Sequence, residues 1–267
     1  MRYWKGSIVL SPTRDQPLLR EVARSAFITH NQLYESLKLD YCASSRKAFN
    51  NRVLRLVNHG LLVRREGIIG SREVVYSVSS SGASALGASL VDSSGKAGLP
   101  GIQILRHCLD LNEVHLALKR TGSLVYWMPE TEIRSQGDLT PHGYWKYYDA
   151  VVTVRLAGQD CKFALEYERT PKAARQYVAI RERIEQETAI RHVLYLVPNH
   201  DFMWFIAEKL SQCRRAVYVG LFQDFLEQNL ALPVRRSGSP ATLTLASVLA
   251  PGKEAQHSGE LFPRFAV

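Results

Sequence analysis

The stretch SRKAFNNRVLRLVNHGLLVRR, residues 45–65, decides the fold of the first part of the chain. Four apolar residues in it recur at the spacing of one helix face: Phe49, Val53, Leu56 and Val57. A serine stands just before this pattern and Gly60 just after it, in the positions that cap the two ends of a helix. The stretch therefore predicts a helix that starts after Ser44 or Ser45, ends at Gly60 and leads into an apolar strand.

A second face of this helix is polar and basic. Its side chains are Arg46, Lys47, Asn50, Asn51 and Arg55. The third helix of a helix-turn-helix domain enters the major groove of DNA, where Arg, Lys and Asn read the edges of bases. We therefore interpret this face as a DNA-reading surface, with a solvated basic helix face as the alternative.

Two shorter helices are expected before this stretch. Residues 17–27 have apolar side chains at helical spacing, with a proline suited to the first turn. Thr29 and Gln32 then fit a capping box, in which each side chain bonds the backbone N–H group of the other residue. The second helix is therefore expected to start near His30 and to end around Leu37.

A hairpin is expected after the third helix. Residues 61–65 and 74–78 are apolar enough for two strands, and the tip between them contains glycine. Three helices followed by a basic hairpin predict a winged helix over residues 14–91, with a small-residue helix within 79–90. We expect the hairpin to place three arginines against DNA phosphates: Arg64, Arg65 and Arg72.

Charge and composition agree with a polyanionic partner. The formal net charge is +9, and residues 44–78 contain seven Lys or Arg against two acids. No apolar run approaches the ~20 residues that span a bilayer, and no signal peptide opens the chain, so a cytoplasmic protein without a membrane partner is expected. The four cysteines form no CxxC pair, which favours reduced packing residues over zinc or disulfides.

A second domain is expected over residues 102–232. Residues 92–101 have linker composition, and the pattern beyond them reads αβββαβαβ, which indicates an α/β domain with a mixed sheet. The expected elements are a helix to about 120, strands at 124–128, 150–156 and 161–168, a helix at 171–188, a strand at 192–197, a helix at 201–213 and a strand at 216–222. A polar loop is expected between the first two strands, and residues 233–267 are expected to form a partly disordered C-terminal tail.

Three carboxylates in this second domain form a candidate site. Glu166 and Glu168 share one face of their strand, about 7 Å apart by strand rise. Asp149 starts the adjacent hairpin strand and can lie alongside them. Such oxygen donors suit Mg²⁺, or Mn²⁺ in its place, which can activate water at a scissile phosphate. Glu113, on the preceding helix, can join from the flank.

The alternative is an ordinary set of salt bridges at the edge of the sheet. Arg169, Lys172 and Arg175 follow the carboxylates closely enough in sequence to neutralise them. Taken from the residues alone, both interpretations stay open.

The sequence also resembles the replication-relaxation family of plasmids and integrative elements, over about residues 18–200. The segments that carry this resemblance are Arg55–Leu62, Trp127–Glu130, Asp149–Val151, Leu165–Thr170 and Tyr177, in that order. The resemblance implies a winged helix joined to a domain similar to the PD-(D/E)XK, or restriction-endonuclease-like, nuclease fold.

This resemblance assigns roles to the carboxylates. It implies that Asp149 and Glu166 hold the metal as the two acids of the nuclease motif, and that Glu113 takes the place of a helix-borne acid. Glu168 stands where the motif has a lysine, and Lys162 or Lys172 is a spatial candidate to replace that lysine.

Three functions follow from these patterns. The first is a non-catalytic protein that binds double-stranded DNA and acts in regulation, replication or mobilisation of a mobile element. The second is a metal-dependent DNA endonuclease that the winged helix targets. The third is an assembly protein whose second domain binds a protein partner or another copy of the chain. Five aromatic residues could also stack on bases of a single strand, with core packing as the alternative: Trp127, Tyr144, Trp145, Tyr147 and Tyr148.

Overall fold

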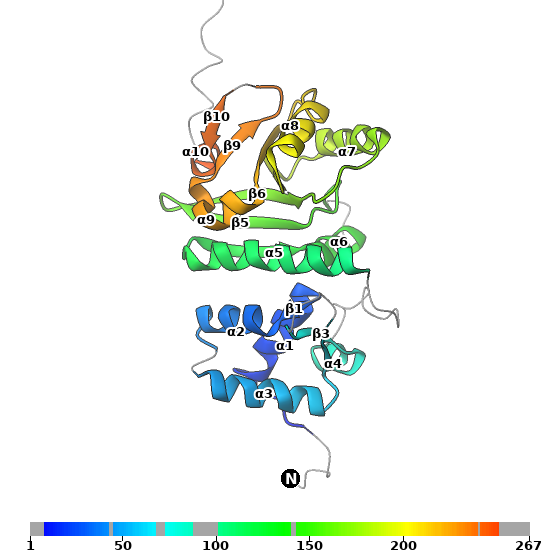
Figure 1. Cartoon of the computed structure of the whole chain (residues 1–267), viewed down its shortest axis with the longest axis vertical. Helices are drawn as coiled ribbons and strands as arrows, with labels where there is room; N and C mark the ends of the chain where they lie inside the picture. Colours follow the sequence, from blue (N-terminus) through cyan, green and yellow to red (C-terminus); the bar gives the residue numbers. More distant parts are fainter. Residues whose placement is uncertain are drawn as a thin grey trace, which may run out of the picture.

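The structure is a computed structural model that describes residues 8–42, 45–67, 73–87, 101–139, 143–239 and 241–250. Its elements form two groups: an N-terminal unit of helices with a small sheet, and a seven-stranded sheet covered by helices. A long helix lies between the two groups (Figure 1). The protein is therefore a mixed α/β structure.

The N-terminal unit contains the three helices that the sequence predicts: α1 (Asp15–Ser25), α2 (His30–Leu39) and α3 (Arg46–Asn58). The capping box at α2 is present, because the Thr29 hydroxyl accepts from the Gln32 backbone N–H and the Gln32 side chain accepts from the Thr29 backbone N–H. Ser45 caps α3 by accepting from the Ala48 backbone N–H at 3.2 Å. These local signals placed the helix starts correctly within two residues.

The two hairpin strands are β2 (Leu62–Arg65) and β3 (Val75–Val78), and the helix α4 (Ser80–Ala85) follows them. A two-residue strand, β1 (Ile28–Thr29), pairs with the other side of β3, so the small sheet has the order β1-β3-β2. The strand β1 was not predicted, because two residues are too few for a periodic pattern. Apolar residues of all three helices and the hairpin pack into one core.

The large sheet has the order β10-β9-β8-β7-β6-β5-β4. Its strands are β4 (Leu124–Pro129), β5 (Ala150–Leu156), β6 (Gln159–Tyr167), β7 (His192–Val197), β8 (Ala216–Leu221), β9 (Pro233–Arg236) and β10 (Thr242–Thr244). Only the pairs β6–β7 and β7–β8 are parallel. The sheet is therefore mixed, as predicted.

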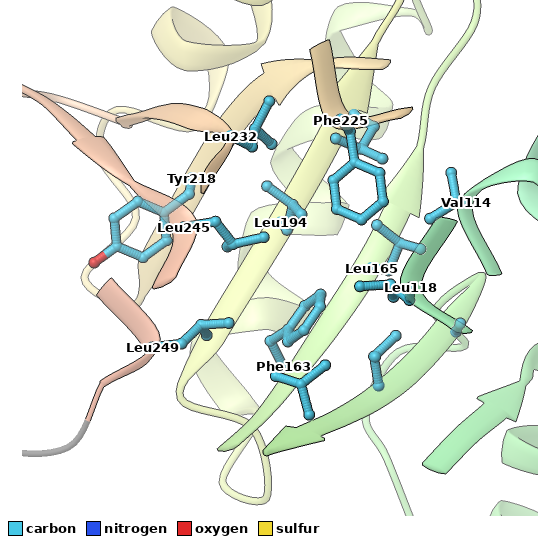
Figure 2. Packing of buried hydrophobic residues seen from close by; sticks show 14 of the residues in the cluster. Val114, Leu118, Phe163, Leu165, Leu194, Tyr218, Phe225, Leu232, Leu245 and Leu249 are labelled. Carbon is cyan, nitrogen blue, oxygen red and sulfur yellow. The ribbon is translucent and has the colours of Figure 1, made fainter. Parts of the chain in front are cut away.

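Helices cover both faces of this sheet. On one face α5 (Ile102–Arg120), α9 (Phe222–Gln228) and α10 (Leu245–Leu249) bury a core around Phe163, Leu165 and Leu194 (Figure 2). On the other face α6 (Glu130–Leu139) packs over β4 and β5, and α7 (Ala174–Gln186) and α8 (His200–Lys209) pack over β6, β7 and β8. The result is a three-layer α/β/α arrangement.

Two predictions for this part of the chain are wrong. The polar loop expected after β4 contains α6, whose fully buried Ile133 packs into the core. Residues 233–239 and 241–249 are not a tail, because β9 and β10 extend the sheet and α10 buries Leu245 and Leu249. Residues 251–267 lie outside the described residues.

The helix α5 belongs to both groups of elements. One of its faces packs on the sheet through Val114 and Leu118, and another contacts the N-terminal unit. Lys119 donates to the Ser36 hydroxyl and to Asp40, each at 2.7 Å. Because these contacts join α5 to α2, the N-terminal unit is fixed against the sheet, although residues 92–100 of the expected linker (residues 92–101) lie outside the described ranges. Among the helices of those ranges, none has the length and apolar character that a membrane span requires.

Candidate functional site

The outer face of α3 carries the polar side chains that the sequence singled out. Lys47, Asn50 and Asn51 are exposed, whereas Phe49, Val53 and Leu56 are buried against the rest of the unit. α3 lies on the side of the N-terminal unit that faces away from α5 and the large sheet (Figure 1). This face is therefore open to a large partner.

Arg46 is held at the start of the same helix. Its guanidinium lies 4.3 Å from the centroid of the Tyr34 ring, and its Nη1 donates to the Asn31 side chain at 3.3 Å. Stacking on an aromatic ring orients a guanidinium without neutralising it. Arg46 thus presents a positive charge between α2 and α3.

Asn50 is held by a chain of hydrogen bonds. His30 Nε2 lies 2.9 Å from Asn50 Oδ1, and His30 Nδ1 lies 3.0 Å from the Tyr76 hydroxyl. An amide oxygen only accepts, so Nε2 carries the hydrogen and Nδ1 accepts from the hydroxyl of Tyr76. Burial lowers the pKa of His30, which keeps the ring neutral. Because these hydrogen bonds use only the oxygen of the Asn50 amide, its NH₂ group faces the surface.

Arg55 differs from its expected role. Its guanidinium forms an ion pair with Asp15, whose side chain is 1% exposed, and Arg52 Nε lies 3.5 Å from the same carboxylate. A buried carboxylate needs such partners, because an unpaired charge inside a protein is strongly unfavourable. Arg55 is therefore a structural residue that joins α3 to α1, and its guanidinium is engaged by Asp15 rather than directed at a ligand.

The hairpin arginines are placed unequally. Arg64 is exposed and forms a 2.5 Å ion pair with Glu66, whereas Arg65 is half-buried. Arg72 lies outside the described residues. A surface hollow between the hairpin, α2 and α3 is lined by His30, Asn31, Arg46, Arg64, Glu73, Val74 and Tyr76. Arg46 and Arg64 thus flank one concave surface beside the exposed face of α3.

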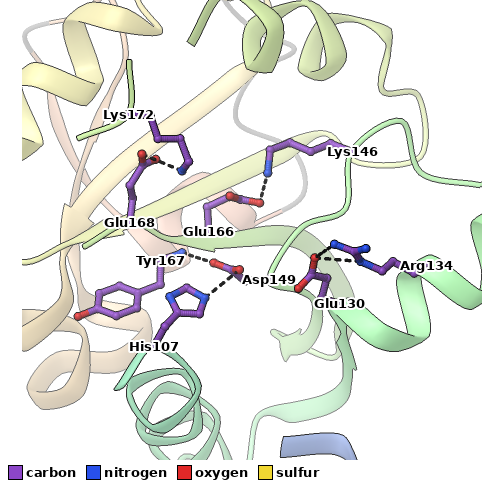
Figure 3. A network of polar contacts seen from close by, with 9 residues as sticks. All are labelled: His107, Glu130, Arg134, Lys146, Asp149, Glu166, Tyr167, Glu168 and Lys172. Carbon is purple, nitrogen blue, oxygen red and sulfur yellow. Dashed lines mark hydrogen bonds and ion pairs between the residues drawn. The ribbon is translucent and has the colours of Figure 1, made fainter. Parts of the chain in front are cut away.

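The carboxylate site lies where β5 begins and β6 ends. Ala150 pairs with Leu165, so Asp149 and Glu166 stand opposite each other one residue further along. Figure 3 shows both side chains in this region, with His107 reaching it from α5. The hairpin register therefore brings together the two acids that the sequence paired.

Glu166 has a partner that the sequence did not reveal. Lys146, in the segment before β5, forms an ion pair with Glu166, and the two side chains are 9% and 10% exposed. Burial raises the pKa of Glu166 to about 7, the positive charge of Lys146 opposes this rise, and the negative charge of Asp149 adds to it. The lysine that pairs with Glu166 is thus Lys146, whereas Lys172 pairs with Glu168.

Both oxygens of the Asp149 carboxylate have partners. Oδ2 accepts the Tyr167 backbone N–H at 2.7 Å, and Oδ1 lies 3.1 Å from His107 Nε2 (Figure 3). Burial lowers the pKa of His107, but the hydrogen bond to Asp149 and the negative charges of Asp149, Glu166 and Glu130 outweigh this and leave the pKa raised. Both oxygens of the Asp149 carboxylate are therefore already hydrogen-bonded within the protein.

Glu168 has partners different from those of Asp149 and Glu166. Its Oε1 accepts from Lys172 Nζ at 2.8 Å and from the Tyr177 hydroxyl at 2.9 Å, and the residue is 3% exposed. Its other oxygen, Oε2, has no hydrogen-bond partner among the described residues. The salt-bridge interpretation is thus confirmed for Lys172, whereas Arg169 pairs with Asp110 at 3.5 Å.

Glu113 does not reach the carboxylates. Its Oε1 accepts from Gln32 Nε2 at 2.7 Å, on the face of α5 that contacts α2. The helix residue that meets Asp149 is His107, six positions earlier in the sequence and on a different face. The position expected for a helix-borne acid is thus taken by an imidazole.

These donors do not fit a preformed divalent-ion site. Within the described parts of the chain, no group of three or more His, Cys, Asp or Glu side chains is arranged to hold a metal ion. Lys146 forms an ion pair with Glu166, and the two oxygens of the Asp149 carboxylate are bonded to His107 and to a backbone N–H group. As arranged, the cluster is an ion-paired network.

No family model matches this chain, and no curated protein matches it. Among solved structures, the restriction endonuclease FokI bound to DNA is similar at a TM-score of 0.26 and 11% sequence identity, over 80% of this chain. This chain spans 43% of the length of that structure. A likeness this slight does not show a shared fold.

Proposed function

We propose that the protein binds double-stranded DNA, with its N-terminal unit acting as a winged helix and α3 entering the major groove. The observation that carries this proposal is the outer face of α3, where Lys47, Asn50 and Asn51 are exposed on the side away from the large sheet. Lys and Asn are side chains that bond base edges in that groove.

Phosphate contacts would come from the flanks of this helix. Arg46 and Arg64 lie on either side of the hollow between α3 and the hairpin. Contacts with phosphates fix the position of a protein on the duplex and make its affinity depend on salt. The formal net charge of +9 favours the same partner.

The seven-stranded unit would then lie in a fixed position relative to the bound DNA, because α5 contacts α2 as well as the sheet. On the sequence resemblance, we place the role of the protein in regulation, replication or mobilisation of a plasmid or integrative element. The ion-paired network favours a sheet unit that acts as a further contact surface over one that cuts DNA.

Binding of a fluorescent duplex, followed by anisotropy at several salt concentrations, tests this proposal. Lys47→Ala combined with Asn51→Ala is expected to weaken binding to a preferred site by about 1–3 kcal/mol per lost base contact. Arg64→Ala is expected to reduce the salt slope by about 0.9 for its phosphate. Arg183→Ala, on the exposed face of α7, is the control that removes one charge from another surface. Equal losses in all three variants would overturn the proposal.

A second candidate function is a Mg²⁺- or Mn²⁺-dependent DNA endonuclease. It is favoured by the contact of Lys146 with Glu166, which stands opposite Asp149. The nuclease motif combines two acids with a lysine, and Lys146 supplies a lysine although Glu168 stands at its place in the sequence. Supercoiled, linear and branched DNA incubated with either ion would test it. Absence of products, or equal cutting by Asp149→Ala, Glu166→Ala and Lys146→Met variants, would exclude this candidate.

A further inference from the structure

The segment that carries Lys146 alternates between buried and exposed side chains. Lys146 and Tyr148 are buried, at 8% and 0% exposure, and Tyr144 packs against the core under α7 and α8. Between them, Trp145 is 58% exposed and Tyr147 is 43% exposed. Two large aromatic rings therefore project from one short segment beside the carboxylates.

This segment is firmly attached to the protein. Lys146 pairs with buried Glu166, and the Trp145 backbone N–H donates to Glu187 Oε2 at 3.2 Å. Glu187 is 1% exposed and also accepts from the Ala189 backbone N–H at 2.9 Å. The backbone beneath the two exposed rings is thus fixed from the inside, so a ligand would lose little of its binding free energy in ordering them.

Positive charges lie along the same segment. The Arg134 guanidinium is 4.9 Å from the centroid of the Tyr147 ring, and Lys162 Nζ is 5.9 Å from that of Tyr144. Arg134 also forms a 2.6 Å ion pair with Glu130, so its charge is partly balanced. Aromatic rings interleaved with cations are the composition of surfaces that bind single-stranded nucleic acid.

We propose that Trp145 and Tyr147 form a stacking site for unpaired nucleobases, with Arg134 and Lys162 next to the phosphates. A duplex hides the faces of its bases in the stack, whereas an unpaired base presents a face that an aromatic ring can cover. This inference deepens the proposed DNA binding by adding a second surface, on the large-sheet unit, for DNA with an unpaired region. It rests on the proposed function only in taking nucleic acid as the ligand.

Two substrates and the full-length protein separate this site from α3. Anisotropy would be measured with a fluorescent oligothymidine of twenty nucleotides and with a blunt duplex of mixed sequence. Trp145→Ala and Tyr147→Ala are each expected to weaken single-strand binding by about tenfold and to leave duplex binding unchanged. Trp204→Ala is a matched control, since Trp204 is 50% exposed on α8 with the Arg235 guanidinium 3.9 Å from its ring centroid.

Fluorescence supplies a second readout. In a Trp204→Phe background, oligothymidine is expected to quench tryptophan emission, and Trp145→Phe is expected to remove that quenching while it retains most of the affinity. Unchanged single-strand affinity in both alanine variants would overturn the inference, as would a wild-type protein that binds duplex but no single strand. A change of oligomeric state in those variants, with equal single-strand affinity, would also overturn it and assign the rings to a protein contact. A wild-type protein that binds the single strand but no duplex would contradict the proposal for α3 and leave this site standing.

Discussion

Lys146 and Glu166 form an ion pair in the interior of the large-sheet unit, although twenty residues separate them in the sequence. The pair fixes the segment before β5 onto the end of β6, and Asp149 stands opposite Glu166 in the same hairpin. A buried pair of this kind stabilises little by itself, but the loss of one partner leaves an unbalanced charge inside the protein. The pair therefore gives a direct way to perturb the site.

Lys146→Met is expected to lower the free energy of unfolding by about 3–5 kcal/mol, because Glu166 would stay buried without its cation. The double variant Lys146→Met with Glu166→Gln is expected to recover much of that loss. Urea unfolding of the wild type, both single variants and the double variant would give the coupling energy. Additive effects of the two substitutions would contradict the buried ion pair.

The stability of the protein is expected to fall as pH rises from 4.5, the ordinary pKa of a glutamate, towards about 7, the pKa of Glu166 in the folded protein. A raised folded-state pKa means that the folded protein binds more protons than the unfolded chain in this window, so its advantage is lost as pH rises. Glu166→Gln is expected to flatten that part of the curve. Urea midpoints of both proteins at several pH values would test this, and identical slopes would show that Glu166 does not titrate there.

Arg55→Ala is expected to destabilise the N-terminal unit by about 1–3 kcal/mol, because the buried Asp15 carboxylate would lose its closer cation and keep the more distant Arg52 and the Ser11 backbone N–H. Its effect on duplex affinity, measured where the variant is fully folded, is expected to be smaller than that of Lys47→Ala. Thermal unfolding and anisotropy on the same samples would separate the two effects. A variant as stable as wild type that loses duplex binding would return Arg55 to the DNA-reading face.

His30→Ala is expected to change sequence preference more than overall affinity. The imidazole of His30 fixes the Asn50 amide, which lies on the exposed face of α3. Because its pKa is lowered, the imidazole is neutral and adds no attraction for phosphates. Binding to a selected site and to random duplex would be compared across salt concentrations. The ratio of the two affinities should fall while the salt slope stays constant, and a changed slope would contradict a positioning role.

The sequence predicted elements whose signals are local. Ser45 before α3 and the Thr29–Gln32 box before α2 are caps that need only their own turn of helix. The strands β5 and β7 are mostly apolar and rich in β-branched or aromatic residues, and their ends match the prediction. By contrast, α6 and β9 have short or weakly apolar sequences, so their burial depends on neighbours that are distant in the sequence.

The candidate site was harder to predict for the same reason. The opposition of Asp149 and Glu166 follows from a short hairpin, which sequence can suggest. Which face of α5 meets the hairpin depends on how that helix packs between two units, so the sequence points to Glu113 whereas the structure places His107 beside Asp149. Lys146 lies between Trp145 and Tyr147, where residue type alone predicts an exposed lysine and buried rings, whereas the structure buries the lysine and exposes both rings.

The position of DNA on the protein tests the central proposal most directly. A photo-crosslinking amino acid would replace Asn51 on α3 in one sample and Arg183 on α7 in another, and each would be irradiated with the same labelled duplex. Both positions are exposed, so their access to solvent is comparable. The proposed function predicts efficient crosslinking from position 51 and little from position 183. Crosslinking from position 183, with none from position 51, would contradict duplex binding through α3.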